Sequence, residues 1–292
     1  MKYAWILKHK RLYPVACMCR VLKVSKSGYY DSLRRPPSQQ SLRRKEIAQA
    51  VARSYFESNR IYGYRKVHKD LEAQNVICCA DTVGRVMREI GLHSRVKRKF
   101  VATTDSDHTL KIADNLIGRD FTAASPNRKW TADITYIPTK TGWLYLAVVM
   151  DLFSRRIVGW AMSKHIDSQL VQSAMHMAIL NRKPAKGLIH HSDRGVQYAA
   201  GDFQDLLDQN EITCSMSRKG DCWDNACVES FFGSLKNEWI RGRIYETQAD
   251  GENDIFKYIE LFYNRKRRHA SLGYVSPAAY EELHAVNQDR AA

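Results

Sequence analysis

The chain of 292 residues carries a formal net charge of +15 at pH 7, and its distribution is uneven. Residues 1–100 hold 23 Lys and Arg against 7 Asp and Glu, whereas residues 101–292 hold 23 against 24. A basic segment of this kind is typical of proteins that bind polyanions, because neutralising phosphates releases counterions. A solvated basic face is the alternative, and nucleic acid is the favoured partner.

The lengths of the apolar runs and the spacing of the cysteines exclude several protein classes. The longest apolar stretch, "WLYLAVVM", has eight residues, and "MKYAWILKHK" holds too short an apolar run for a signal peptide, so no membrane segment is expected. Seven cysteines without a C-x-x-C pair argue against a disulfide framework and a zinc ribbon. A reduced, cytosolic compartment fits.

Residues 1–36 read as a helix-turn-helix-like leader. A helix is expected over Val15–Leu22, and Ser25 is a plausible N-cap of a second helix. The segment "RRPPSQQS" (34–41) breaks the helical pattern and reads as a linker.

Residues 37–100 read as a second helix-turn-helix unit. The pattern predicts a helix over Arg65–Ala73 and another over Thr82–Glu89, capped by Asp81 and stopped by Gly91. DNA is favoured over RNA, since no aromatic RNA-binding strand signature is present. The candidate DNA-contacting side chains are Arg85 and Arg88, three positions apart, and Lys97, Arg98 and Lys99 in "SRVKRKF".

After a linker at 101–123, residues 124–240 change to strand periodicity. In "KWTADITYI" the residues Trp130, Ala132, Ile134 and Tyr136 share one face of a strand. Tight turns at "TKTG" and "FSRR" predict a three-stranded antiparallel meander. Helices are then expected after Asp167, over Ala199–Gln209 and over Asn225–Trp239, with strands at "GLIHHSD" and "ITCSMS". The fold class is therefore α/β, a mixed sheet with helices packed on it, preceded by all-α segments.

Residues 241–292 are expected to form a C-terminal helical and basic segment. A helix is predicted over Asp254–Tyr263. The basic stretch "NRKRRHASLGYVSP" follows, and its Arg267 and Arg268 are candidates for DNA contact, with packing on the core as the alternative.

Three carboxylates fall at places suited to a metal site. Asp133 lies in a strand, Asp193 follows one, and Glu229 lies on the helix after the last strand, with 35 residues between the last two. Carboxylate oxygens suit Mg²⁺ or Mn²⁺. Pattern alone leaves alternatives open: a strand-end Asp is often a turn residue, and Glu229 could be a solvated helix acid. Asp151 is expected to pair with an arginine, and Asp221 and Asp224 to cap a helix.

Five motifs carry a resemblance to a known family. They are "WTADITYI", "AVVMDLFSRRIVGW", "HSDRGVQY", "DNACVESFFGSLKNE" and "YNRKRRHASLGYVSP". In this order and at this spacing they resemble the second-reading-frame transposase product of the insertion-sequence-three family. The resemblance implies a retroviral-integrase-like core of the ribonuclease H superfold, with a catalytic triad of Asp133, Asp193 and Glu229.

The resemblance further implies how such a chain works. Two Mg²⁺ or Mn²⁺ ions would support phosphoryl transfer on the terminal repeats of the element and on target DNA, and Lys236 and Asn225 would point at the substrate. It also implies self-association on DNA, fusion by frameshifting to a first-reading-frame protein, and a cytoplasmic, nucleoid-associated location in a bacterium. Two other functions stay open: a DNA-binding regulator without catalysis, and a ribonuclease H-like nuclease that cuts without joining.

Overall fold

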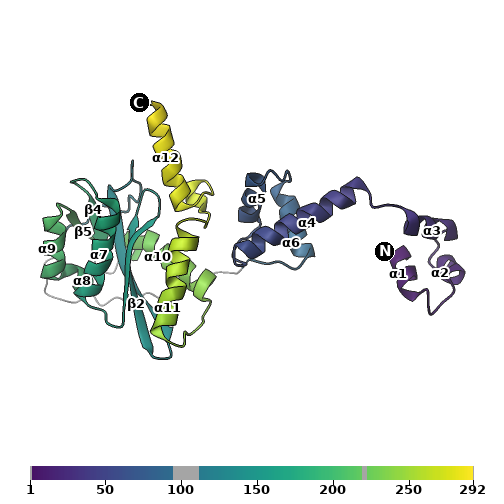
Figure 1. Cartoon of the computed structure of the whole chain (residues 1–292), viewed down its shortest axis with the longest axis horizontal. Helices are drawn as coiled ribbons and strands as arrows, with labels where there is room; N and C mark the ends of the chain where they lie inside the picture. The colour runs from purple at the N-terminus through teal and green to yellow at the C-terminus, as the bar shows by residue number, and fades with distance from the viewer. Residues whose placement is uncertain (1, 95–111, 219–221, 292) are drawn as a thin grey trace.

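The computed structural model describes residues 2–94, 112–218 and 222–291. Its N-terminal part is helical, with α1 (Lys2–His9), α2 (Val15–Val21), α3 (Lys26–Arg34), α4 (Gln39–Glu57), α5 (Tyr64–Ala73) and α6 (Ala80–Glu89). Figure 1 shows α1–α3 at one end of an elongated molecule, α4–α6 in the middle and an α/β core at the other end. The fold class expected from the sequence is confirmed.

The first three helices form a small unit around four buried side chains, Ile6, Met18, Cys19 and Tyr29. The expected N-cap is present, because the Ser25 hydroxyl accepts a hydrogen bond from the Gly28 N–H at 3.0 Å. The helix over residues 15–21 is confirmed as well.

Helix α4 is a correction to the sequence reading. The last three residues of the stretch read as a linker belong to it, because Ser38 accepts a hydrogen bond from the Ser41 N–H and the helix starts at Gln39. Its apolar face, which includes Val51, is buried against α5 and α6. The second unit therefore has three helices rather than two.

The predicted α5 is confirmed, with Val67 and Leu71 fully buried. In α6 the cap differs from the prediction. The helix starts at Ala80 after Cys79, so Asp81 lies in the first turn. Its negative charge there still interacts favourably with the helix dipole. Gly91 follows the end of α6 at φ +71°, as expected of a stop residue.

The core contains one five-stranded mixed sheet in the order β3-β2-β1-β4-β5. Strands β1, β2 and β3 form the predicted antiparallel meander, and β4 and β5 extend it in parallel from β1. The strands are β1 (Lys129–Thr139), β2 (Gly142–Asp151), β3 (Ile157–Ser163), β4 (Ile189–Ser192) and β5 (Thr213–Met216). The helices between and after them are α7 (Ser168–Arg182), α8 (Val196–Ala199), α9 (Gly201–Gln209) and α10 (Ala226–Ser234).

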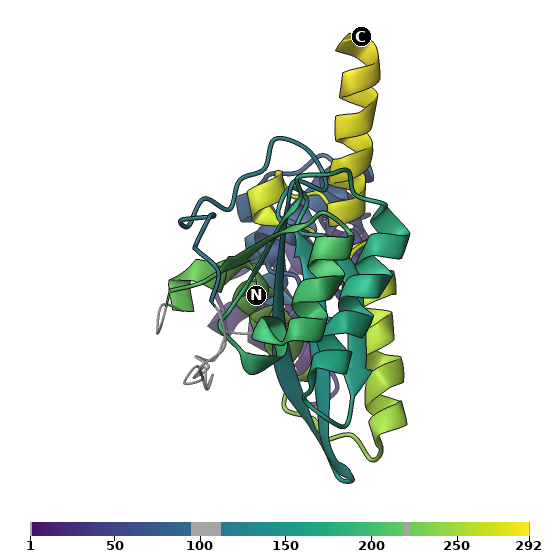
Figure 2. The ribbon, with the colours of Figure 1, turned by 90° about the vertical axis from the view of Figure 1, so that its left-hand side faces the viewer.

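Helices cover both faces of the sheet, α7 on one side and α10 with α11 (Gln248–Phe256) on the other (Figures 1 and 2). Strand β2 alternates accordingly: Leu146 and Val148 join one buried cluster and Ala147 and Val149 the other. Tyr136 departs from the expected apolar face of β1, since it is 43% exposed and its ring packs against Trp143.

Gly159 lets β3 and α7 approach closely. A Cβ atom at this position would lie 2.2 Å from the carbonyl oxygen of Ala174. Any other residue would push the helix from the sheet, so this glycine fixes the spacing of the two layers.

Three predicted helices are segmented. The helix expected over 199–209 is divided into α8 and α9 at Ala200, and the Glu229 helix continues as the π-helical η2 (Leu235–Ile240). The helix expected from Asp254 starts earlier, because Thr247 and Asp250 form a capping box for α11, which continues as the π-helical η3 (Lys257–Tyr263). Short 3₁₀ turns, η1 (Cys222–Asn225) and η4 (Ala270–Leu272), and the projecting α12 (Pro277–Ala291) complete the chain (Figure 2).

The α4–α6 unit contacts the segment after η3 directly. The Tyr62 hydroxyl donates to the Lys266 carbonyl and accepts from the Arg268 N–H, both at 2.9 Å. The Arg268 guanidinium also forms an ion pair with Asp70 at 2.5 Å. These contacts, which we call the helix–core seam, join parts of the chain about 200 residues apart.

No helix in the described part of the chain has the length and apolar character needed to cross a membrane.

Candidate active site

Two of the three candidate carboxylates lie side by side at the centre of the sheet. Parallel strands β1 and β4 pair Thr131 with His191. Asp133 and Asp193 each follow two residues later, so they lie level with one another where β4 has ended. Neighbouring strands are about 4.8 Å apart, so the two carboxylates lie next to each other at the carboxyl end of β4.

The third carboxylate comes from α10, which packs on β1. Val228, Phe231 and Phe232 are buried and hold the helix on the sheet. Glu229 is only half-buried, yet burial raises the pKa of its carboxyl group above the usual value. Glu229 lies near enough to the sheet for its charge to raise the pKa of Asp133.

Asp133 is affected by the charges of the other two acids. Burial raises the pKa of Asp133 well above its usual value, and the charges of Asp193 and Glu229 raise it further. Burial also raises the pKa of Asp193, although a hydrogen bond from the Gly195 N–H opposes this. Such a concentration of carboxylates holds protons unless a cation neutralises it.

Lys236, on η2, contributes positive charge beside this cluster. Its Nζ lies 4.6 Å from the centre of the Tyr136 ring. Burial lowers the pKa of Lys236, while the negative charge of Asp133 acts in the opposite direction. The lysine therefore lies near the carboxylates, and its contact with DNA stays a prediction.

The residues fit a divalent cation by their chemistry. Across residues 2–94, 112–218 and 222–291, no Lys or Arg forms a direct ion pair with Asp133, Asp193 or Glu229. The same ranges contain no ready-made group of three His, Cys, Asp or Glu ligands. The donor set is all carboxylate oxygen, which Mg²⁺ and Mn²⁺ prefer.

Asn225 is placed differently from the DNA-facing position expected of it. It is 5% exposed, and its side-chain amide bonds the buried Thr131 hydroxyl and the Ala132 carbonyl on β1. An amide whose donor and acceptor are both occupied inside the protein is not available to a nucleic acid. Asn225 is an internal contact between α10 and β1.

Arg267 is also a correction. It is 7% exposed, and its guanidinium makes a bidentate pair with Glu238, both bonds at 2.7 Å, and a third bond to Ser234. Arg268 is occupied in the helix–core seam, with further bonding to the Tyr274 carbonyl. The packing alternative for this segment is the one that the structure supports.

Arg85 and Arg88 are exposed on α6, opposite the buried Val83, Val86 and Met87. Their contact with DNA remains a prediction that the position allows. Lys97, Arg98 and Lys99 lie outside the described residues, and so does Asp221.

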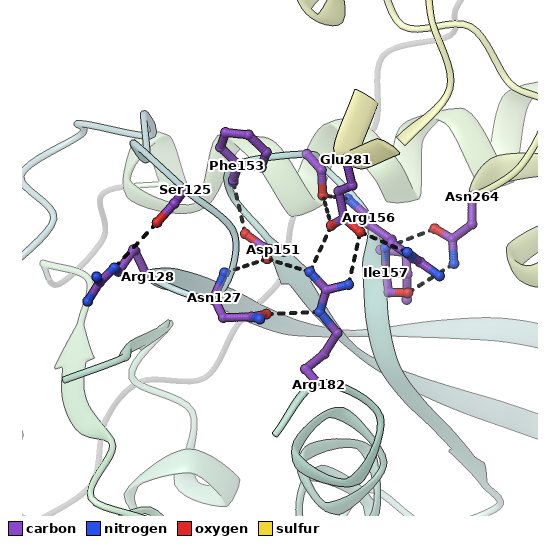
Figure 3. Close-up of polar contacts among 11 residues, drawn as sticks. Ser125, Asn127, Arg128, Asp151, Phe153, Arg156, Ile157, Arg182, Asn264 and Glu281 are labelled. Atoms are coloured by element: carbon purple, nitrogen blue, oxygen red, sulfur yellow. Dashed lines mark hydrogen bonds and ion pairs between the residues drawn. The ribbon is translucent and has the colours of Figure 1, made fainter. Parts of the chain in front are cut away.

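Asp151 has the arginine partner that the sequence predicted. Its carboxylate accepts hydrogen bonds from the backbone N–H groups of Asn127 and Phe153 and pairs with Arg182 at 3.3 Å. Figure 3 shows Arg182 bridging Asp151 to Glu281 on α12. Asp151 is therefore a structural residue.

Asp224 is not a helix cap. Its buried carboxylate accepts hydrogen bonds from Asn115 and pairs with Arg119 and Arg218, and these contacts lower its pKa to about 2, with Arg218 as the largest cause. Sequence reasoning missed these partners, because nothing local links residues 115–119 to residue 224. The two histidines before Asp193, His190 and His191, are fully buried.

The arrangement defines a ribonuclease H-like integrase core with an acidic site at the sheet centre. Two family models described as "Integrase core domain" match residues 123–222 and 210–277, and one described as "HTH-like domain" matches residues 42–100.

Curated relatives then specify the family. The chain is 41% identical over 265 residues to the "Insertion element IS600 uncharacterized 31 kDa protein" of Shigella sonnei, covering 91% of this chain and 97% of that one. It is 41% identical over 283 residues to "Transposase InsF for insertion sequence IS3A" of Escherichia coli K12, covering 96% and 98%. The chain belongs to this IS3 transposase family.

Among solved structures, the magnesium complex of the HTLV-2 integrase catalytic core in its trimeric form aligns with 18% identity and a TM-score of 0.43. The alignment covers 55% of this chain and 99% of that one.

Proposed function

We propose that this chain is the transposase of a bacterial insertion sequence, and that it cleaves and joins the DNA ends of that element. The observation that carries the proposal is the placement of Asp133 and Asp193 level with one another at the end of β4, with Glu229 near enough for its charge to raise the pKa of Asp133. A structural ion pair would need a basic partner, whereas a cation site needs surplus negative charge.

The carboxylates of Asp133, Asp193 and Glu229 would hold two Mg²⁺ or Mn²⁺ ions. When bound, such ions lower the pKa of a coordinated water molecule and stabilise charge on a leaving oxygen. The chain's own part is to fix the three acids on two strands and one packed helix. Cleavage adds water across a phosphodiester and leaves a 3′-hydroxyl. In joining, that hydroxyl attacks a phosphodiester of another strand, and the oxygen of the broken bond leaves as a new 3′-hydroxyl. Neither step needs a covalent bond to the protein.

The DNA ends would be held by the basic N-terminal third. The exposed Arg85 and Arg88 on α6 can contact phosphates or base edges, and Lys236 lies close enough to the acidic site to contact the end being cut. The same role for Lys97, Arg98 and Lys99 rests on sequence alone.

Two further partners belong to the proposal. Two DNA ends must be brought together, so the chain would associate with further copies of itself on DNA. A first-reading-frame protein, fused by frameshifting, would complete the active form in the bacterial cytoplasm.

The test is a strand-cleavage and joining assay on the element's terminal DNA with Mg²⁺ or Mn²⁺, comparing wild type with Glu229→Gln. We expect metal-dependent joining by the wild type and at least about 1000-fold less by the variant, with DNA binding retained. A matched control is Glu260→Gln, an acid that accepts a hydrogen bond from the Trp160 indole away from the site.

The other outcomes separate the rival functions. Equal joining by Glu229→Gln and wild type would remove Glu229 from the triad. Cutting without joining would identify a nuclease. Specific end binding with neither activity, also in the upstream-fused form, would identify a regulator.

A further inference from the structure

The turn before the Glu229 helix is bonded to both strands that carry the aspartates. On the β1 side, the Thr131 hydroxyl donates to Asn225 Oδ1 at 2.5 Å, and Asn225 Nδ2 donates to the Ala132 carbonyl at 3.0 Å. Thr131 is fully buried. Ala132 is covalently joined to Asp133, so the amide of Asn225 bonds the backbone directly before that carboxylate.

On the β4 side, His191 makes the equivalent connection. Its Nε2 lies 3.1 Å from the Asp224 carbonyl oxygen, which can only accept, so Nε2 carries the proton. Its Nδ1 then accepts from the Ser215 hydroxyl at 2.9 Å, which itself accepts the Leu116 N–H. His191 stands two residues before Asp193 on the same chain segment.

The turn itself is fixed independently of the strands. The side chain of Asp224 is fully buried, and its carboxylate is held by the Arg218 N–H at 3.0 Å, by the guanidinium of Arg218 at 3.1 Å and by that of Arg119 at 3.2 Å. Asn115 Nδ2 adds a bond at 2.8 Å. A turn with so many partners cannot change its orientation without breaking several of them at once.

We propose that the Asp224–Asn225 turn is the joint that sets Glu229 relative to Asp133 and Asp193, with Thr131, His191 and Asn225 as positioning residues. Glu229 lies one helical turn after Asn225, so a small rotation at the joint moves its carboxylate directly. The inference rests on the proposed function, because it concerns the same three acids.

The physical reason for such a joint is the geometry that a metal site demands. Ligands must be held within about 0.5 Å of the productive arrangement, and changes in the residues that orient ligands typically cost about 10–100-fold in metal affinity or activity. Here the ligands come from three separate elements, so their relative placement depends on bonds between those elements. Asn225 and His191 supply such bonds.

The test measures Mn²⁺ binding by titration calorimetry on the full chain without DNA, together with kcat and KM for joining. Thr131→Val keeps shape and strand preference but removes the hydroxyl. We expect about 10–100-fold weaker Mn²⁺ binding and a lower kcat, an unchanged KM for end DNA, and recovery in Thr131→Ser. The matched control is Thr135→Val, the same change at a buried position on the same strand.

A second variant, Asn225→Asp, sets two effects against each other. It adds negative charge near the cation site, which by charge alone would strengthen Mn²⁺ binding, but it loses the Nδ2 donor to the Ala132 carbonyl. We expect binding about tenfold weaker than wild type. Unchanged or tighter binding would overturn the positioning role, whether or not the variant is less stable.

Glu229→Gln in the same titration separates the two proposals. If Glu229→Gln binds Mn²⁺ like wild type, the triad fails and the joint has nothing to position. If Glu229→Gln weakens binding while Thr131→Val does not, the triad stands and the joint is wrong.

Discussion

Asp133 and Asp151 are aspartates on adjacent strands of one sheet, and their surroundings are opposite. Asp151 is surrounded by donors: two backbone N–H groups and the Arg182 guanidinium, which is itself paired with Glu281 (Figure 3). Asp133 faces two further acids, whose charges raise its pKa. Burial raises the pKa of both carboxyl groups. At Asp151 the N–H donors and Arg182 oppose that rise, whereas at Asp133 the neighbouring acids add to it, so an ionised Asp133 destabilises the fold until a cation arrives.

The largest expected effect comes from removing the charge at Asp133. Asp133→Asn should lower joining by at least about 1000-fold, since cation stabilisation of the transition state is worth several kcal/mol. The metal-free variant should be as stable as wild type or more so at neutral pH. The reason is that the pKa of the Asp133 carboxyl group is raised in the folded state. The folded protein therefore loses stability as the pH rises from the unfolded-state pKa of this group to its folded-state pKa.

Thermal unfolding in EDTA and a joining assay check this prediction together. A marked fall in melting temperature for Asp133→Asn would mean that the charge is structurally satisfied after all, and the contrast with Asp151 would disappear.

Asp151→Ala should show the reverse pattern. Removing one partner of a buried ion pair costs about 3–5 kcal/mol of unfolding free energy, and the lower end applies here because Arg182 keeps Glu281. Joining per folded molecule should change little. Urea unfolding measures the free energy of unfolding, and a joining assay scaled to the folded fraction measures activity per folded molecule. Lys186→Ala, which removes an exposed pair with Glu211, is a control that should leave stability unaltered.

A loss of joining in fully folded Asp151→Ala, at a temperature well below its transition, would instead make Asp151 part of the active site.

His190 extends the comparison to a buried group on the other face of the sheet. Burial is the main cause that lowers its pKa to about 3, and the charge of His191 adds to it. The unfolded chain therefore binds the proton first as pH falls below about 6.5, and stability is lost from there down to the folded pKa. Between pH 7 and pH 5 this single group should cost about 2 kcal/mol.

His190→Phe should flatten that pH dependence, because both ring nitrogens of His190 lack a hydrogen-bond partner among the described residues and its neighbours include Phe203 and Tyr198. Urea unfolding at several pH values measures it. An unchanged acid slope would assign the loss to other groups.

Much of the fold could be predicted because periodicity is a local property. The meander, the buried strands and the Asp167 and Ser25 caps depend on residues within a few positions of each other. Helix α4 is not predicted, although Ile47, Val51 and Tyr55 follow a helical spacing. The prolines before it and its basic residues are more typical of a linker. The π-helical continuations have no comparable sequence signal.

The candidate site divides in the same way. The position of Asp133 follows from the alternation of apolar and polar residues along its strand, and that of Asp193 from the end of the strand before it. The roles of Asn225 and Arg267 could not be read, because a polar residue looks the same in sequence whether its partner is DNA or a buried group far along the chain. Glu238 and Thr131, the partners that decide these cases, are 29 and 94 residues away.

The helix–core seam has an evolutionary consequence. Asp70 and Arg268 are 198 residues apart, yet neither can change freely without the other. A recombinant that acquires a foreign α4–α6 unit, and with it a new DNA preference, would place unrelated side chains opposite Arg268 and the Lys266 carbonyl. Exchange of end specificity between such elements should therefore succeed most often when the segment around residues 266–274 is inherited together with the helices.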